Sequence, residues 1–210
     1  MKGDVVYLSS AEAKDFLLPK HYSGRAPNIS YSFGWKIGGE LVAVCTFGKP
    51  ASNNLCVGIC GEEHSSRVYE LNRLCRVDDL KEQLSSFLSA CLRRISADNL
   101  IIVSYSDTQM NHHGYIYQAT NFFYTGCTKR RTDKYTEGNK HSRHYDNESQ
   151  NGLRKVRFPK HRYVYFAMKD KRLRKECLVA MNYEILDYPK GDNSNYVLGE
   201  YAEPIVIKKG

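Results

Sequence analysis

The chain has 210 residues, which fits one domain with an appendage, and its 41% apolar content is sufficient for a real core. Its formal net charge of +8 favours a polyanionic partner, nucleic acid or a phosphate-bearing cofactor, although a basic enzyme without nucleic-acid contact carries such a charge too. No apolar run approaches the roughly 20 residues of a membrane span, and the first residues lack the long apolar segment of a signal peptide. Seven cysteines, an odd number in apolar contexts, indicate buried thiols in a reducing compartment. We therefore expect a cytoplasmic protein without a membrane span.

The N-terminal residues predict a strand followed by a helix. Residues 5–8 are apolar enough for the strand. Ser9 and Glu12 have the spacing of a capping box, in which each residue's side chain accepts the other's backbone N–H. We expect the helix to end near Leu18, because Pro19 follows it.

A β-hairpin is predicted next. Residues 33–37 and 41–47 are apolar and flank a Gly-Gly turn, which is a strong hairpin signal. The loop before the hairpin, 20–25, contains His, Tyr, Gly and Arg, and such loops serve either as functional sites or as solvated connectors. Residues 48–66 are predicted to form a long loop.

Residues 67–77 alternate in the manner of a strand, with Arg73 among apolar neighbours. A partly buried arginine needs a carboxylate or a phosphate as its partner. An internal pair with Glu70 would satisfy that need without any ligand, so both interpretations stay open.

The clearest helix signal follows. Asp79 and Glu82 have capping-box spacing, and the apolar residues after them recur on one helical face. Ser85 and Ser86 lie near the start of this helix, where phosphates are favoured. Serines are also common near helix starts for propensity alone.

Residues 100–103 are an uninterrupted apolar run, typical of a strand that is buried on both faces. Asp107 follows it, and then His112 and His113. Polar groups at the carboxyl end of such a strand lie where open sheets bind their ligands. Asp107 is therefore a candidate catalytic carboxylate, and a helix N-cap is the alternative.

The C-terminal half is less regular. We expect a short helix within 114–122, a strand at 123–125 and a last core strand at 161–167. Residues 129–157 are basic and poor in large aliphatic side chains, which predicts a long mobile loop that is either a solvated insertion or a nucleic-acid clamp. Residues 178–210 show little periodicity and are expected to pack on the domain as an extension.

This order of elements resembles the GNAT acetyltransferase fold, an α+β fold with a central mixed sheet flanked by helices. Within it, several motifs resemble the phage Mom family of DNA modification proteins. The specific part is Ser104-Tyr105-Ser106-Asp107 together with the block from His113 to Gly126. The other matching motifs are His21-Tyr22-Ser23-Gly24-Arg25, Glu70-Leu71-Asn72-Arg73-Leu74, Ser85-Ser86-Phe87-Leu88, Lys140-His141-Ser142-Arg143-His144 and Lys160-His161-Arg162-Tyr163.

The match covers roughly residues 18–167. It implies a GNAT-like catalytic domain over 1–177, with 129–157 as a basic loop insertion and 178–210 as the extension.

The resemblance implies an enzyme that converts adenine in duplex DNA to N6-carbamoylmethyladenine, which protects the DNA from restriction. Four residues would then be catalytic, namely His21, Tyr22, Asp107 and Tyr117. Three would contact acetyl-coenzyme A, namely Arg73, Ser85 and Ser86. The basic residues expected to bind double-stranded DNA are Arg25, Lys129, Arg130, Arg131, Lys140 and Arg143. One departure is visible, because residues 76–81 carry two acids and no glycine where acetyltransferases have a glycine-rich pyrophosphate loop.

The chemistry of that product sets further requirements. Adenine N6 is a poor nucleophile, and Asp107 is the candidate to accept its proton. The base must leave the duplex, so stacking on Tyr or Phe is expected. Tyr117, Phe122 and Tyr124 are the candidates, and core packing is the expected role of most of these rings.

A carbamoylmethyl group joins N6 to a CH2 carbon, whereas acyl transfer would form an amide. A second donor or a metal is therefore needed. Iron suits imidazole ligands, which His21, His112, His113, His141 and His144 would supply, although their spacing identifies no metal site. The alternatives are an ordinary N-acetyltransferase of a small-molecule or protein amine and a non-catalytic DNA-binding module. The oligomeric state stays open, with a homodimer among the alternatives.

Overall fold

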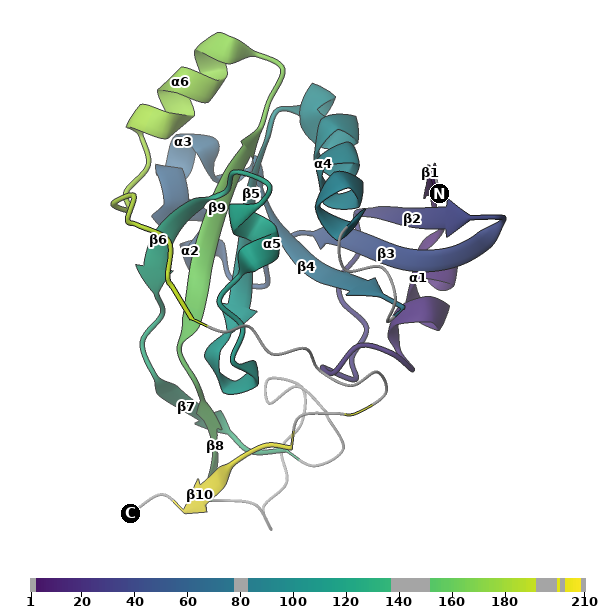
Figure 1. The fold of residues 1–210 in the computed structure, drawn as a ribbon. Helices are drawn as coiled ribbons and strands as arrows, with labels where there is room; N and C mark the ends of the chain where they lie inside the picture. Colours follow the sequence, from purple (N-terminus) through teal and green to yellow (C-terminus); the bar gives the residue numbers. More distant parts are fainter. Residues whose placement is uncertain (1–2, 78–82, 137–151, 192–199, 201–202, 209–210) are drawn as a thin grey trace.

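The computed structural model describes residues 3–77, 83–136, 152–191, 200 and 203–208. A central sheet of seven strands dominates the fold (Figure 1). In spatial order these are β1 (Asp4–Tyr7), β2 (Tyr31–Ile37), β3 (Glu40–Gly48), β4 (Val68–Arg76), β5 (Leu100–Asp107), β9 (Lys160–Ala167) and β6 (Phe123–Cys127). The helices are α1 (Ser10–Leu17), α2 (Asn53–Cys60), α3 (Glu62–Ser65), α4 (Leu84–Ile95), α5 (Tyr115–Gln118) and α6 (Lys171–Val179). None of the described helices is long and apolar enough to cross a membrane.

The first elements form as the sequence predicts. Ser9 Oγ accepts the Glu12 N–H at 3.2 Å and Glu12 Oε2 accepts the Ser9 N–H at 2.8 Å, so the capping box is complete. Gly38 and Gly39 join β2 to β3 with φ of 60° and 89°. Two successive residues in this left-handed region give a turn whose twist matches that of the strands.

The sheet is mixed because β4 and β5 run parallel, whereas every other neighbouring pair is antiparallel. Only three residue pairs join β4 to β5, the last being Glu70 with Val103. Beyond that point the two strands separate, and the separation is visible in Figure 1. The residues that follow on each strand therefore face an opening rather than a neighbouring strand.

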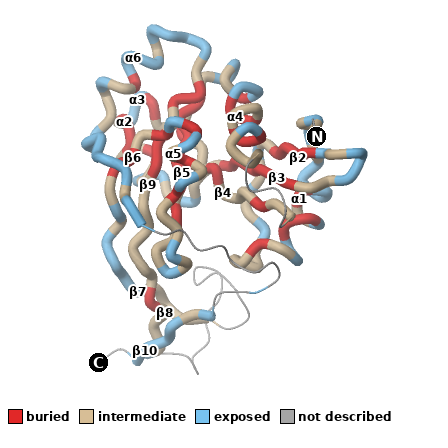
Figure 2. The backbone as a smooth tube through the Cα atoms, viewed as in Figure 1, coloured by how far each residue is buried: buried red, intermediate tan, exposed pale blue. Residues whose placement is uncertain are grey.

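The core lies on both faces of the sheet (Figure 2). The predicted apolar face of α4 is buried, and Phe87 stacks on Trp35 at 5.7 Å between ring centroids. On the other face, Ile59 of α2 and Cys177 of α6 pack with Ile101 of β5. Helix α1 packs through its own apolar residues near β3 and β4. The sheet is thus covered by helices on both faces, as in the predicted fold class.

Two local predictions need correction, namely the loops predicted at 48–66 and 129–157. The predicted loop 48–66 contains α2 and α3, which bury Ile59 and His64. Their short lengths, with Gly58 inside α2 and Gly61 between the two helices, hid them from the sequence analysis. The start of α4 lies at Leu84, and the predicted cap at Asp79 is outside the described residues.

The basic segment 129–157 is also more ordered than predicted. It supplies β7 (Arg131–Lys134) and β8 (Leu153–Arg157), and β10 (Val206–Lys208) joins them to form a second sheet of order β10-β8-β7. Residues 137–151 lie outside the described part. Figure 1 shows this small sheet beyond the ends of β6 and β9. Charged residues outnumber apolar ones in β7 and β8, so the hydrophobic pattern did not reveal this sheet.

Gly114 brings the loop after β5 against the core. Its φ is 74°, and a Cβ built there would lie 2.5 Å from the ring of Tyr163, which is fully buried. Tyr163 also donates its hydroxyl to the His113 carbonyl at 2.6 Å. This glycine therefore permits a close approach that no other residue allows.

We expect Gly114→Ala to lower the free energy of unfolding for two reasons. The left-handed conformation costs alanine about 1–2 kcal/mol, and overpacking against Tyr163 adds about 1–3 kcal/mol. Gly38→Ala is the control, because its φ is 60° and its Cβ meets nothing within 4 Å. Urea unfolding should show the larger loss for Gly114→Ala, and equal losses would contradict the contact with Tyr163.

Candidate active site

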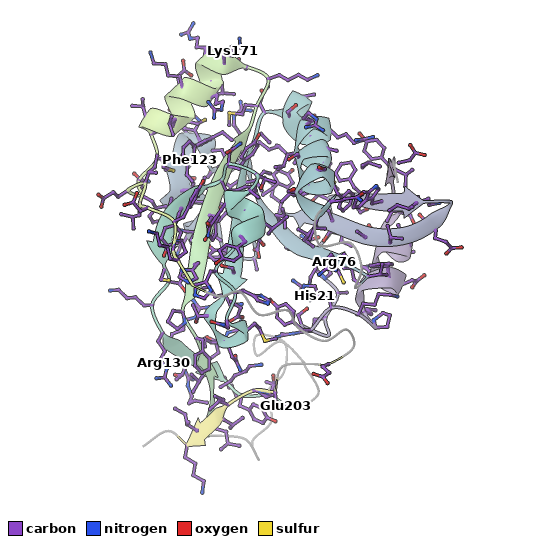
Figure 3. The ribbon with its side chains drawn as sticks, viewed as in Figure 1. His21, Arg76, Phe123, Arg130, Lys171 and Glu203 are labelled. Carbon is purple, nitrogen blue, oxygen red and sulfur yellow. The ribbon has the colours of Figure 1, made fainter. Side chains whose placement is uncertain are left out.

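The opening between β4 and β5 leads into a cavity of about 1540 Å³. Its wall is built from the loop after α1, the two separating strands, the loop before α5 and the small sheet. The predicted site residues that line it are His21, Tyr22, Arg25, Arg73, Asp107, Tyr117, Lys129 and Arg131. Figure 3 shows His21 between Arg76, the last residue of β4, and Glu203, which lies near β10. The fold thus brings together residues that are far apart in the sequence.

His21 is held by the end of α1. Its backbone N–H donates to the Leu17 carbonyl at 2.8 Å, and its ring stacks on Tyr22 at 4.5 Å. The Ser23 N–H donates to His21 Nδ1 at 3.2 Å, so the proton of the neutral ring is on Nε2. Burial, and then the nearby charge of Arg73, lower the pKa of His21 to about 3. His21 is therefore a neutral imidazole at physiological pH.

Tyr22 lines the cavity beside His21. Burial, followed by the charge of Asp107, raises the pKa of Tyr22 to about 12. The edge of its ring contacts His112 at 5.9 Å between centroids. A neutral phenol and a neutral imidazole side by side make a polar, uncharged patch, which suits a nucleobase better than a charged ligand.

Asp107 ends β5 and has the helix-capping role that the sequence analysis gave as the alternative to catalysis. Its Oδ1 accepts the Gln109 N–H at 3.0 Å and so caps the short 3-10 helix Thr108–Met110. Its Oδ2 pairs with Lys160 Nζ at 2.6 Å. Only 14% of the Asp107 side chain is exposed. The carboxylate is thereby held in one orientation at the cavity wall.

Arg73 is a half-buried cation that forms no ion pair with a carboxylate in the described part of the chain. Its Nη1 donates to the Asn72 carbonyl at 2.6 Å and its Nη2 to the Arg25 carbonyl at 3.2 Å. Its Nε is buried and has no hydrogen-bond partner among the described residues. Burial lowers the pKa of Arg73, and the charge of Glu70 acts in the opposite direction. An anion is the group that this guanidinium lacks.

Glu70 is a site residue whose importance the sequence analysis did not recognise. It lies on β4 at the last pair with β5 and lines the cavity. Burial raises the pKa of Glu70, although Arg73 and Lys160 act in the opposite direction. Its side chain makes no hydrogen bond within the described part of the chain. The sequence signal was its place in the Glu-Leu-Asn-Arg motif, where it was weighed only as a partner for Arg73.

The three aromatic residues proposed to stack on a base occupy different places. Tyr117 lines the cavity but is 8% exposed and packs 5.1 Å from Tyr163, and burial raises its pKa. Phe122 is fully buried, and neither it nor Tyr124 lines the cavity. Core packing is thus the role of Phe122 and Tyr124, as expected for most of these rings, and the two are not candidates for base stacking.

Other predicted residues lie outside the cavity wall. Ser85 and Ser86 are on the first turn of α4, and only their neighbour Leu84 lines the cavity. Arg130 lies over the Phe158 ring at 5.5 Å and does not line it. Lys140 and Arg143 are not among the described residues.

The cavity wall is strongly basic. Three of its described residues are acidic, namely Glu70, Asp107 and Glu203, whereas ten are basic. The basic residues are Arg25, Lys49, Arg73, Arg76, Lys129, Arg131, Lys155, Arg157, Lys160 and Arg162. Such an excess favours an anionic ligand and attracts it from a distance.

No metal site is formed by the described residues, since no group of three or more His, Cys, Asp and Glu side chains has a suitable arrangement. His21, His112 and His113 therefore do not assemble the predicted iron site among themselves. His141 and His144 are outside the described part.

Comparison with known proteins identifies the family of this chain and the proteins that share its fold. Residues 4–190 match the model of the Mom protein family. The chain belongs to this family. No curated protein matches the sequence.

The fold of this Mom family member is similar to that of an N-acetyltransferase from Staphylococcus aureus Mu50. The two are 11% identical, the alignment covers 80% of this chain and 99% of that one, and the TM-score is 0.50. The ribosomal-protein-S18-alanine N-acetyltransferase from Escherichia coli aligns at 8% identity over 80% and 95% of the two chains, with a TM-score of 0.47. The first likeness shows the fold, and the predicted GNAT-like sheet is confirmed.

The pH dependence of stability tests whether His21 is buried in the cavity wall. A histidine with a folded-state pKa below its unfolded value stabilises the protein above about pH 6.5, and that stability is lost as the pH falls toward 3. We expect the difference in unfolding free energy between wild type and His21→Gln to shrink by up to about 1.4 kcal/mol per pH unit from pH 6 to 4. Urea unfolding at each pH measures it. A difference independent of pH would show that His21 is solvated.

Proposed function

We propose that this protein is a DNA modification enzyme that adds a group to N6 of adenine, forming N6-carbamoylmethyladenine in duplex DNA. Membership of the Mom family carries the proposal. A deep basic cavity with a fixed carboxylate and an uncharged aromatic patch supports it, because a flipped base attached to a polyanion needs these features. The expected consequence is protection of the DNA from restriction enzymes.

The described side chains have complementary tasks in this proposal. Tyr22 and neutral His21 contact the base and orient its amine. Asp107 accepts a proton from N6, because the amine lone pair is delocalised and becomes nucleophilic only as that proton leaves. Lys160 keeps the Asp107 carboxylate in place. Glu70 is a second acceptor, and its raised pKa brings it closer to the ideal for proton exchange near neutral pH.

In this proposal acetyl-coenzyme A binds in the cavity as the source of a carbon unit. Arg73 offers a buried Nε without a partner among the described residues, and Leu84 places the start of α4 at the wall. The coenzyme would supply an activated acyl group when bound. Acyl transfer alone forms an amide at N6, so a carbamoylmethyl product needs a further donor or a metal-assisted step.

A small-molecule N-acetyltransferase is the second candidate function, favoured by the likeness of the fold to the Staphylococcus aureus enzyme. Expression in a bacterium followed by mass spectrometry of the DNA nucleosides separates the two. The proposed function requires adenosine that carries the added mass of a carbamoylmethyl group. Unmodified adenosine under all conditions would exclude it.

We expect Asp107→Asn to reduce the level of modified adenine by about 100-fold or more, since the proton acceptor is lost. Asparagine caps a helix as well as aspartate does, so the fold should persist. Asp170→Asn is the matched control, because Asp170 caps α6 outside the cavity and accepts the Arg172 and Leu173 N–H groups. Nucleoside mass spectrometry of all three strains provides the measurement. Full activity in Asp107→Asn would remove Asp107 from the mechanism.

We expect Glu70→Gln to change the stability of the protein and its activity on DNA in opposite directions. Because the folded-state pKa of Glu70 is raised, ionising it opposes folding at pH 7, and its protonated form favours folding below about pH 4.5. We therefore expect the variant to be more stable than wild type at pH 7, equally stable at pH 4, and less active on DNA.

Urea unfolding at the two pH values and nucleoside mass spectrometry measure these effects. Glu176→Gln is the control, since Glu176 is an exposed glutamate paired with Arg172 on α6. It should cause no gain in stability. A less stable Glu70→Gln protein at pH 7 would show that Glu70 has a structural ion pair instead.

A further inference from the structure

Two basic residues of the cavity wall lie outside the motifs that identify the Mom family. Lys155 and Arg157 are two positions apart on β8 and so project from the same face of the strand. On the neighbouring strand β7, Asp133 lies opposite Lys155 and Arg131 lies opposite Arg157. Both Lys155 and Arg157 line the cavity, and so does Arg25 from the loop after α1. Strand β8 and the loop after α1, which are far apart in the sequence, thus both supply cations to the cavity wall.

These cations are incompletely neutralised. Arg157 Nε pairs with Asp133 Oδ2 at 3.0 Å, and Arg131 shares that carboxylate at 3.6 Å. The side chains of Arg25 and Lys155 make no hydrogen bond or ion pair with any other residue that the structure describes. One aspartate therefore serves a group of four cations, all of which line the cavity.

The cations also repel one another. Burial lowers the pKa of Lys155, Arg157 and Arg25 lower it further, and Asp133 and Glu203 act in the opposite direction. Burial lowers the pKa of Arg25 as well, with an additional contribution from Arg157. Half-buried cations that crowd together cost free energy unless an anion joins them. A phosphate, with several acceptor oxygens, suits arginine and lysine together.

We propose that Arg25, Lys155 and Arg157 form a binding site for a backbone phosphate of the DNA strand that delivers the adenine. The site lies where the small sheet meets the loop that carries His21 and Tyr22, on the outer side of the base-binding patch. A flipped nucleotide enters base first and leaves its phosphates at the mouth of the cavity. Arg73, which is proposed to meet the coenzyme, contacts this site only through the Arg25 backbone carbonyl, which accepts from Arg73 Nη2 at 3.2 Å and is retained in Arg25→Ala. This inference rests on the proposed function.

The salt dependence of DNA binding tests the site. The double variant Arg25→Ala/Lys155→Ala removes the two unpaired cations and leaves the Arg157–Asp133 pair intact. Lys171→Ala/Arg174→Ala removes the same charges from α6, at the far end of the molecule in Figure 3. Fluorescence anisotropy with an adenine-containing duplex should show that the slope of log K against log salt is reduced by about 0.9 in the first variant only. Equal slopes in the two double variants would overturn the proposal.

A second measurement identifies the source of the phosphate. Isothermal titration calorimetry with acetyl-coenzyme A should give the same affinity for wild type and Arg25→Ala/Lys155→Ala. Weaker binding of the coenzyme together with unchanged DNA binding would assign the phosphate to the coenzyme and overturn the proposal. Thermal unfolding of each variant verifies that the fold is intact.

Modification in cells separates this inference from the proposed function. If wild type produces modified adenine and both double variants produce equal amounts, the phosphate site is refuted and the proposed function stands. If wild type produces none, the proposed function itself fails. The expected result is a loss of modification of about 10-fold or more in Arg25→Ala/Lys155→Ala alone, as expected when a phosphate contact that positions the strand is lost.

Discussion

The separation of β4 from β5 is the constraint on which the rest of this structure depends. Parallel strands that pair over only three residues leave unpaired backbone and side chains beyond the last pair. A cavity occupies this gap, with Glu70 where pairing ends, Arg73 on β4 and Asp107 at the end of β5. If the two strands stayed paired to their ends, the backbone groups would be satisfied within the sheet and no cavity could form there. The pairing elsewhere in the sheet is extensive, which makes the opening local.

Burial determines the chemical character of the groups around this opening. His21 and Tyr22 are buried enough to be neutral at physiological pH, and they stack on each other. Asp107 is held by Lys160 and a backbone N–H, whereas Glu70 has no such partner in the described structure. Two carboxylates in one cavity therefore differ in environment, a pattern that lets one orient a substrate while the other exchanges a proton. The surrounding excess of basic side chains gives the whole cavity an attraction for polyanions.

The small sheet extends the cavity outward. It is built from the basic segment around β7 and β8 together with β10 near the C-terminus. The pairing gives charged strands a regular spacing, so cations separated by many residues meet at one place. A flexible basic loop would also attract DNA, but it would not hold Lys155 and Arg157 beside Arg25. This arrangement is what permits a specific phosphate site rather than a diffuse charge.

Much of the fold was predictable from sequence, because its elements have strong local signals. The capping box of α1, the Gly-Gly hairpin, the apolar face of α4 and the apolar run of β5 all formed where predicted. Short helices that contain or adjoin glycine, such as α2, and strands rich in charged residues, such as β8, were missed. Their stability comes from tertiary contacts with little local preference.

By itself, the sequence determined the family, the fold class and the residue types of the site. His21, Arg73 and Asp107 could be named because each belongs to a recognisable motif. Only the tertiary structure decided that Phe122 belongs to the core, that Glu70 lies desolvated at the point where two strands part, and that Lys155 meets Arg25. The physical reason is that solvation and charge depend on distances between segments far apart in the chain, and no local pattern encodes those distances.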